Sequence, residues 1–271
     1  MADETPRTDA EAAAELAAMF PALDAWRVRL RTPLIPDAGS PLAADDEAWS
    51  PSPLSALAVT KLSTAVDHLQ AIRVLCEAKS YHPTATYTLT RSALLAASEA
   101  LWLLGPAESA LRQSRGLWVA RNAAEEHVKY LRAIKDGPGV LWARLGIVRG
   151  HLAMRRRGIE LRRGELPPPG KTTNTDVVEW SAQHLQPHQP EWVAQALGLW
   201  REGSGNAHGF QYAAIQGLPE QSPPSSGDGL YAFQVGGSPL KTWRHYYVAA
   251  MTLGRAWQRW DELASTTKRT T

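Results

Sequence analysis

The sequence has a single cysteine and no long apolar run, and both shortages exclude whole classes of protein. With Cys76 alone, the chain forms neither an intrachain disulfide framework nor a cysteine-rich zinc site, which favours a reducing, intracellular setting. No apolar run approaches the roughly 18 residues that a membrane span needs. The acidic, alanine-rich start lacks the basic segment of a secretory signal peptide. We therefore expect a cytoplasmic protein without a membrane partner.

Several catalytic motifs are missing as well. The sequence contains no HExxH, no Glu-x-x-His, no G-x-S-x-G and no Walker loop. These absences argue against a zinc metalloprotease, a di-iron bundle, a serine hydrolase and a P-loop nucleotide enzyme. We expect no metal site and no cofactor.

The composition that remains is that of an ordinary globular protein, with 44% hydrophobic residues, 21% charged residues and a net charge of +2. The charge is uneven, however. Residues 1–53 carry ten acidic residues and four arginines, whereas residues 139–171 carry eight basic and two acidic residues. The basic stretch contains Arg155, Arg156 and Arg157, which are candidates to bind a nucleic acid. A solvated helix face, or a basic segment packed on the acidic one, explains the same pattern.

Apolar residues recur every three or four positions along most of the chain, and prolines or glycines separate these stretches. The fold class is therefore all-α, an irregular multi-helix bundle with at most one short hairpin near 230–236. We expect an N-terminal helix and proline-rich connector, then one bundle domain, then a disordered tail, over 1–53, 54–264 and 265–271. The expected helices cover 8–31, 54–76, 84–104, 107–135, 139–163, 176–185, 190–200, 207–216 and 240–264.

Local signals refine these helices. Pro21 is expected to break or kink the first helix, because proline removes a backbone hydrogen bond. The prolines of residues 32–53 predict an extended connector. Asp176 and Glu179 have the spacing of a capping box before a short helix.

The segment 84–104 is the most apolar, and we expect it at the centre of the bundle. Arg91 and Glu99 lie on it eight residues apart, near one face, and a charge in such a place must be paired or face a cavity. They either pair with other helices or border a polar pocket with His208. Most tryptophans, Trp142 among them, stand at helix-stripe positions, which predicts packing in the core or in interfaces rather than base stacking.

One pair of residues, Arg201 and His208, is typical of a catalytic site that acts on a phosphodiester. Seven residues are nearly two helical turns, so on a continuous helix both side chains share one face, about 10 Å apart along the axis. A histidine takes or gives a proton near neutral pH, and an arginine stabilises charge developing on phosphate oxygens. Aimed at one phosphodiester, the pair would let an RNA 2′-hydroxyl attack without a metal ion.

This spacing resembles the R-x(4–6)-H signature of the HEPN (higher eukaryotes and prokaryotes nucleotide-binding) superfamily. The chain also resembles a group of uncharacterised actinobacterial all-helical proteins across roughly 55–215. The similar segments are Arg91-Ser-Ala-Leu…Gly105 and Arg201…Ser204-Gly-Asn-Ala-His-Gly209. The resemblance implies an all-α bundle, often dimeric, and in many members a metal-independent ribonuclease of antiviral or toxin–antitoxin systems.

The candidate catalytic residues are thus Arg201 and His208. Ser204 and Asn206, which lie between them, are candidate supporting residues. Arg91 and Glu99 are further supporting candidates, on the central helix.

The count of such matches is no evidence by itself, because the spacing occurs three times, at Arg121–His127, Arg144–His151 and Arg201–His208. The first pair is about 120° out of phase on a helix and should not converge. The side chains of the second pair share one helix face. That helix is basic, however, and an ordinary solvent-exposed face explains its charges. Only the third pair has the Ser-Gly-Asn-Ala-His-Gly setting of the resembling proteins.

A purely structural explanation of this segment is also open. Gly203 and Gly205 are expected to weaken or end the helix that the superfamily keeps, and asparagine does not directly follow the arginine. The glycines would then form a corner between helices, Asn206 or Ser204 would cap the next helix, and His208 would bond a backbone carbonyl.

Three hypotheses follow. The first is a HEPN-like metal-independent endoribonuclease, a defence or toxin component, acting as a homodimer on RNA through Arg201 and His208. The second is a catalytically silent HEPN-like bundle that binds a protein or nucleotide partner and buries His208. The third is a nucleic-acid binder that uses the basic helix around 155–157, with salt-sensitive binding that survives loss of His208.

Overall fold

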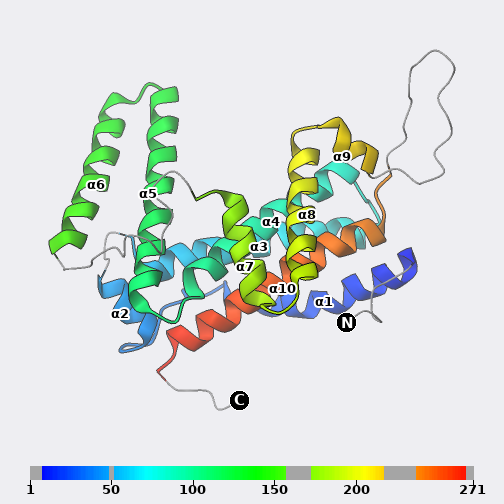
Figure 1. The fold of residues 1–271 in the computed structure, drawn as a ribbon, viewed down its shortest axis with the longest axis horizontal. Helices are drawn as coiled ribbons and strands as arrows, with labels where there is room; N and C mark the ends of the chain where they lie inside the picture. Colours follow the sequence, from blue (N-terminus) through cyan, green and yellow to red (C-terminus); the bar gives the residue numbers. More distant parts are fainter. Residues whose placement is uncertain (1–7, 49–51, 157–171, 217–235, 267–271) are drawn as a thin grey trace.

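The computed structural model describes residues 8–48, 52–156, 172–216 and 236–266, and all regular structure within these ranges is helical. The expected all-α, multi-helix bundle is confirmed (Figure 1). The helices are α1 (Asp9–Arg29), α2 (Pro41–Ala48), α3 (Leu54–Glu77), α4 (Pro83–Leu104), α5 (Ser109–Ala133), α6 (Gly137–Arg156), α7 (Asn174–Leu185), α8 (Pro190–Ala207), α9 (Gln211–Gln216) and α10 (Pro239–Ala264).

Helix α4 lies at the centre, as its apolar sequence predicts. It packs most closely with α3 and α10, and also contacts α5, α7 and α8. Leu101, Leu103 and Leu104 at its C-terminal end are fully buried. The amphipathic helix α10 adds Tyr246 and Trp257 to the same core, because its apolar stripe faces α4. Helix α8 therefore packs directly against the central helix of the bundle.

The first helix runs through Pro21 without ending, so the expected break is wrong. The apolar stripe continues on both sides of the proline, since Leu16 and Leu23 are both buried in the core. At the end of the helix, Arg29 pairs with Asp261 of α10 at 3.2 and 2.5 Å. This packing on α10 outweighs the one backbone hydrogen bond that the proline removes.

The connector over 32–53 is not extended throughout, because it contains helix α2. The Ser40 hydroxyl accepts a hydrogen bond from the Ala43 amide at 3.2 Å, and Pro41 occupies the first helical turn, where proline is favoured. Leu42 and Asp45 are completely buried. The helix N-cap and the burial of these two side chains thus outweigh the local preference of this proline-rich segment for an extended conformation.

Helix α7 begins two residues before the predicted start. Its capping box consists of Thr173 and Asp176, whose side chains each accept a hydrogen bond from the other residue's amide, at 3.3 and 2.7 Å. The predicted partner of Asp176 in a capping box, Glu179, instead accepts a hydrogen bond from Gln183 along the exposed face.

Helices α5 and α6 form a hairpin that stands out from one end of the bundle (Figure 1). Lys135 adopts the left-handed conformation in the turn between them, with φ of 61°. Trp142 on α6 is 66% exposed, so of the two expected roles, packing in the core or in an interface, the first does not apply to this residue. Trp102, Trp200 and Trp257 are buried as expected.

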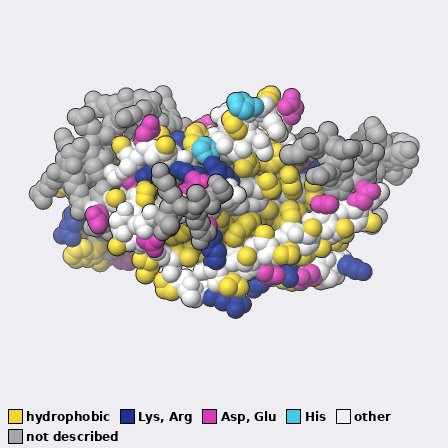
Figure 2. All heavy atoms as spheres, turned by 90° about the horizontal axis from the view of Figure 1, so that it is seen from below, with side chains coloured by type: hydrophobic (Ala, Val, Ile, Leu, Met, Phe, Trp, Pro, Cys, Tyr) yellow, Lys and Arg dark blue, Asp and Glu magenta, His cyan; other side chains and the backbone are white. Residues whose placement is uncertain are grey.

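Other expectations fall outside the described residues. Residues 157–163 of the basic helix, the hairpin near 230–236 up to residue 235, and the tail from 267 onward belong to this group. Among the helices that the structure does describe, none combines the length and the apolarity that crossing a membrane requires. On the face shown in Figure 2, apolar side chains gather over the middle and charges of both signs are scattered around them, so this face carries no uniform basic surface.

The packing of α7 gives His184 an unusual environment. Its ring stacks on Trp180 at a centroid distance of 4.7 Å. Burial lowers the pKa of His184, and the positive charges of Arg255, Arg259 and Arg115 lower it further. The folded protein therefore favours the neutral imidazole.

We expect this histidine to make the protein less stable in mild acid. The unfolded chain takes up a proton near pH 6.5, whereas the folded chain resists it, so stability is lost as the pH falls from 6.5 through the lowered pKa. His184→Gln should therefore show a smaller decrease in Tm between pH 7.5 and 5.5 than the wild type. His188→Gln, at an exposed position, is the matched control. Equal decreases in all three proteins would contradict this role.

Candidate functional site

Helix α8 is continuous from Pro190 to Ala207, so the expected interruption at Gly203 and Gly205 is wrong. Both glycines are needed for close packing rather than for a turn. A Cβ on Gly203 would lie 2.8 Å from Arg91 Cβ and 3.2 Å from the Tyr87 carbonyl oxygen, both on α4. A Cβ on Gly205 would lie 2.5 Å from the Tyr212 hydroxyl. The two glycines bring α8 against α4 and α9.

The helix ends after Ala207 instead, in a Schellman motif that Gly209 completes. Gly209 has φ of +67°, a conformation that favours glycine. The Phe210 amide bonds the Gly205 carbonyl at 2.9 Å, and the Gly209 amide bonds the Asn206 carbonyl at 3.1 Å. His208 is the C-cap residue, with helical backbone angles. The short helix α9 then folds back, and the Tyr212 hydroxyl donates to the Arg201 carbonyl at 3.1 Å.

Arg201 and His208 both expose their side chains to solvent. Because the helix between them is unbroken, their spacing of seven places them on the same side of α8, about 10 Å apart along the axis. The His208 ring stacks on Phe210 at 5.5 Å between centroids. The structural alternative, a buried His208 bonded to a carbonyl, is not what the described residues show.

Arg201 lies in a groove of about 390 Å³ between α8, α9 and α10. Arg244 contributes a second cation to this groove from α10, and Glu202 contributes a carboxylate. His208 is not one of the residues that line it. The remaining lining residues are Gln195, Gly198, Leu199 and Tyr212.

The carboxylate in this groove is already engaged. His245, buried on α10, donates through Nε2 to Glu202 Oε2 at 3.2 Å, and its ring packs on Tyr87 at 4.6 Å. Burial alone would raise the pKa of Glu202, but the bond from His245 and the charges of His245, Arg244 and Lys241 hold it below its ordinary value. Glu202 therefore stays ionised and anchors α8 to α10.

The neighbouring phenol is kept protonated by the same environment. Burial raises the pKa of Tyr87 well above its usual value, and the carboxylate of Glu202 adds to this effect. Tyr87 is thus a packing surface for His245 and not a base at neutral pH.

Neither of the supporting residues on α8 caps the next helix. Asn206 is buried and donates through Nδ2 to the Glu202 carbonyl at 3.0 Å, within α8 itself. Ser204 is half-buried, and its carbonyl accepts the His208 amide at 3.2 Å. Both residues support the last turn of α8 and so fix the backbone of His208.

Arg91 and Glu99 have separate structural roles. The Arg91 guanidinium stacks on Trp200 of α8 at 4.2 Å from the ring centroid, and burial lowers its pKa. Glu99 pairs with Lys61 of α3 at 2.5 Å. They do not border a common pocket with His208. Arg91 still bears on the site, because it packs beneath Gly203 and positions α8.

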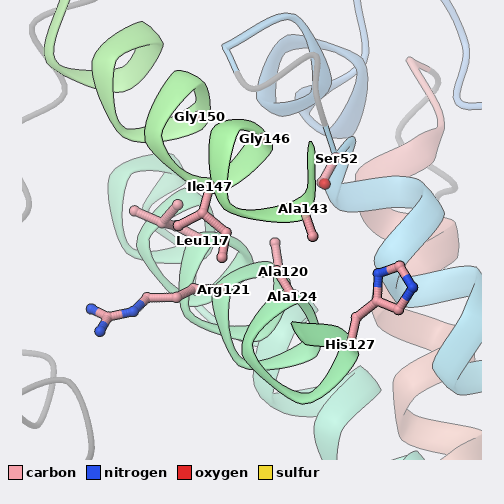
Figure 3. A pocket seen from close by; sticks show the side chains of 10 residues that line it. All are labelled: Ser52, Leu117, Ala120, Arg121, Ala124, His127, Ala143, Gly146, Ile147 and Gly150. Atoms are coloured by element: carbon pink, nitrogen blue, oxygen red, sulfur yellow. The ribbon is translucent and has the colours of Figure 1, made fainter. Parts of the chain in front are cut away.

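The other two matches to the spacing are not supported as sites. Arg121 and His127 line a pocket of about 230 Å³ between α5 and α6, but their side chains point in opposite directions (Figure 3). Arg121 instead pairs with Glu125 at 2.7 Å. The side chain of His151 lies outside the described part of the chain.

The predicted nucleic-acid-binding arginines are only partly described. Arg155 and Arg156 stand in the last turn of α6, and their side chains are not described; Arg157 lies outside the described residues. Their proposed role stays a prediction.

Sequence reasoning missed Arg244, Glu202, His245 and Tyr212. Arg244 and His245 lie more than forty residues from Arg201 along the chain, so no spacing signal links them to it. Burial raises the pKa of Cys76 to about 11, so its thiol is protonated at neutral pH. Within the described ranges, no three His, Cys, Asp or Glu side chains gather as a metal site would require.

No protein-family model, curated protein or solved structure matches this chain.

Proposed function

We propose that the chain is a metal-independent endoribonuclease of HEPN type whose catalytic residues are Arg201 and His208. The observation that carries this proposal is the continuity of α8 through Gly203 and Gly205. It places an exposed arginine and an exposed histidine on one side of one helix. A second cation, Arg244, shares the groove of Arg201 and adds to the attraction for a phosphate.

The proposed reaction is transfer of the phosphodiester to the adjacent 2′-hydroxyl. His208 takes the proton of the 2′-hydroxyl, the 2′-oxygen bonds to phosphorus, and the bond from phosphorus to the 5′-oxygen breaks. The 5′-oxygen takes a proton from water, leaving a 2′,3′-cyclic phosphate and a 5′-hydroxyl. Arg201 stabilises the negative charge that develops on the phosphate oxygens.

His208 lies beyond the groove of Arg201, so one RNA strand would have to extend along α8 to reach both. A strand that follows this side of the helix meets Arg201 first and the His208–Phe210 stack about two turns later. Exposed aromatic rings are surfaces on which bases stack. A second chain is a further way to complete the site, consistent with the homodimer that the superfamily resemblance implies.

A second candidate is a catalytically silent bundle that binds a protein partner. The observation that favours it is the set of exposed apolar side chains on α6. In that case Arg201 and His208 do no chemistry, and RNA incubated with the protein stays intact.

The experiment that tests the proposal is incubation of the full chain with mixed cellular RNA in EDTA. Wild type should cleave in the chelator and leave 2′,3′-cyclic phosphate ends. His208→Ala should lose at least about a hundredfold in cleavage rate, the usual contribution of a general base. Arg201→Ala should lose activity as well, because no other group takes its place on α8.

His188→Ala is the matched control, since His188 is also exposed but precedes α8. It should cleave like the wild type. If wild type does not cleave, or if His208→Ala cleaves equally, the catalytic proposal is wrong. RNA binding by both wild type and His208→Ala, with no cleavage by either, would instead favour the nucleic-acid-binding hypothesis for the basic helix.

A further inference from the structure

Helix α6 has two apolar faces, and in the described part of the chain only one of them packs against another helix. Ala143, Ile147 and Gly150 line the contact with α5. The opposite side of the helix carries a second set of apolar residues, which we call the α6 stripe: Leu141, Leu145, Val148 and Leu152. These side chains are 37 to 59% exposed, and the packing contacts of α6 are with α5. Such a continuous exposed apolar row on a protruding helix marks an interaction surface.

The spacing of the α6 stripe indicates the shape of what covers it. Its residues follow one another at intervals of four, three and four, which is the seam of a two-helix coiled coil. The stripe is about 60° wide and about 17 Å long. A helix that packs against a broad apolar surface, such as a protein core, carries an apolar stripe of 100° or more. The occupant that fits is therefore one further helix laid along α6.

The charges beside the α6 stripe indicate the chemistry of that helix. Arg144 and Arg149 are exposed and lie about 70° to either side of the stripe's centre. Residues 137–156 contain no Asp or Glu. A partner helix with acidic residues beside its apolar seam would pair with both arginines, as flanking positions do in coiled coils.

The same charges argue against a second copy of this chain. Two α6 helices packed together would bring arginines beside arginines with no acidic residue of α6 to offset them. Four half-exposed side chains also present less than the roughly 800 Å² per partner that a stable dimer interface buries. Trp142, 66% exposed, lies about 90° from the centre of the stripe, on the side of Arg149, and adds a large apolar side chain beside it.

We propose that the α6 stripe docks one amphipathic helix of a partner protein, with apolar residues at alternating intervals of three and four and with Asp or Glu on both flanks. This docking surface is independent of the proposed catalytic site, because α6 and α8 lie on different parts of the bundle (Figure 1).

The probe is a synthetic three-heptad peptide with Leu at its seam positions and Glu at its flanking positions, measured by fluorescence anisotropy against the full chain at low salt. A second peptide carries Lys at the same flanks. The Glu peptide should bind at micromolar concentrations, and the Lys peptide at least tenfold more weakly. Added salt should weaken the binding of the Glu peptide.

Three variants make the test specific. Leu145→Glu should weaken binding of the Glu peptide at least tenfold. Arg144→Glu combined with Arg149→Glu should reverse the preference, so that the Lys peptide binds better. Val74→Glu, at an exposed apolar position on α3, should change nothing. Because all of these side chains are exposed, the variants should keep the wild-type circular dichroism.

Several outcomes would overturn the proposal. One is no binding of the Glu peptide; another is equal binding of both peptides. A third is that the chain does not bind the peptide but binds phosphatidylserine vesicles or single-stranded RNA, and that Leu145→Glu abolishes this binding. That result would assign the surface to a lipid or a nucleic acid. The last is a dimer in light scattering that Leu145→Glu dissociates, which would assign it to a second copy.

Discussion

Replacing Asp45 by alanine is expected to destabilise the folded chain by about 3–5 kcal/mol, the usual cost of leaving a buried charge without its partner. Asp45 Oδ2 accepts from Arg112 Nε at 2.7 Å, and the two side chains are 0 and 3% exposed. Since a domain is stable by only about 5–15 kcal/mol in total, this loss is a large share of its stability.

The contacts around the pair explain why the loss should be so large. Asp45 also accepts hydrogen bonds from the Ser109 hydroxyl and, at 3.3 Å, from Gln113 Nε2. Arg112 Nη1 donates to the carbonyls of residues 106 and 107 at 3.0 and 2.7 Å. The pair therefore joins α2 to the start of α5 and to the loop before it, and alanine would leave the guanidinium without its counter-charge.

Thermal and urea unfolding followed by circular dichroism would measure this effect. Glu125→Ala is the control, since it removes the surface pair with Arg121 and should cost under about 1 kcal/mol. Asp45→Leu combined with Arg112→Met should recover much of the lost stability, because replacing both charges leaves neither unpaired. A loss below about 1 kcal/mol in Asp45→Ala would show that the pair does not hold the connector.

The second large effect is expected from one methyl group on α8. Gly203→Ala should destabilise the protein by about 1–3 kcal/mol, because the new Cβ meets Arg91 Cβ and the Tyr87 carbonyl oxygen, and a backbone atom cannot rotate away. Helix α8 would have to move away from α4, and the exposed side of α8 would move with it.

Gly198→Ala is the matched control on the same helix. No atom lies within 4 Å of the position its Cβ would take. Alanine there should stabilise the protein by about 0.5–1 kcal/mol, because glycine in a helix interior costs conformational entropy. The two substitutions should therefore shift Tm in opposite directions. Shifts of the same sign would mean that Gly203 is not a point of close helix packing.

Much of the helical pattern can be predicted from the sequence, because the spacing of apolar residues and the prolines and glycines between helices indicate the same boundaries. The apolar stripe of α10 and the proline at the start of α4 predict those helices to within one residue. The failures lie where long-range contacts outweigh local signals. Pro21 was expected to break or kink a helix, but the helix continues through it, with Leu16 and Leu23 buried on either side.

The glycines of α8 show why the candidate site was harder to predict. A glycine in a sequence indicates equally a chain reversal, a helix end or a close approach of two backbones. Gly209 adopts the left-handed conformation just after the helix end, whereas Gly203 marks the close approach to α4. The distinction depends on α4, which lies about a hundred residues away in the sequence. The spacing of Arg201 and His208 was visible from the start, but the groove with Arg244 was not, since α10 brings that residue from the far end of the chain.

The pairing of the first and last helices has a consequence for the order in which the chain folds. Asp9 accepts a hydrogen bond from the Leu240 amide, and the Asp37 amide bonds the Ala264 carbonyl. These contacts join residues more than 220 positions apart, so the loops that they close are among the longest in the molecule and the slowest to form. Until α10 has been synthesised, the sides of α1 and α4 that pack against it stay uncovered. The core is thus completed only once α10 is available, and the partly folded chain is prone to aggregation until then.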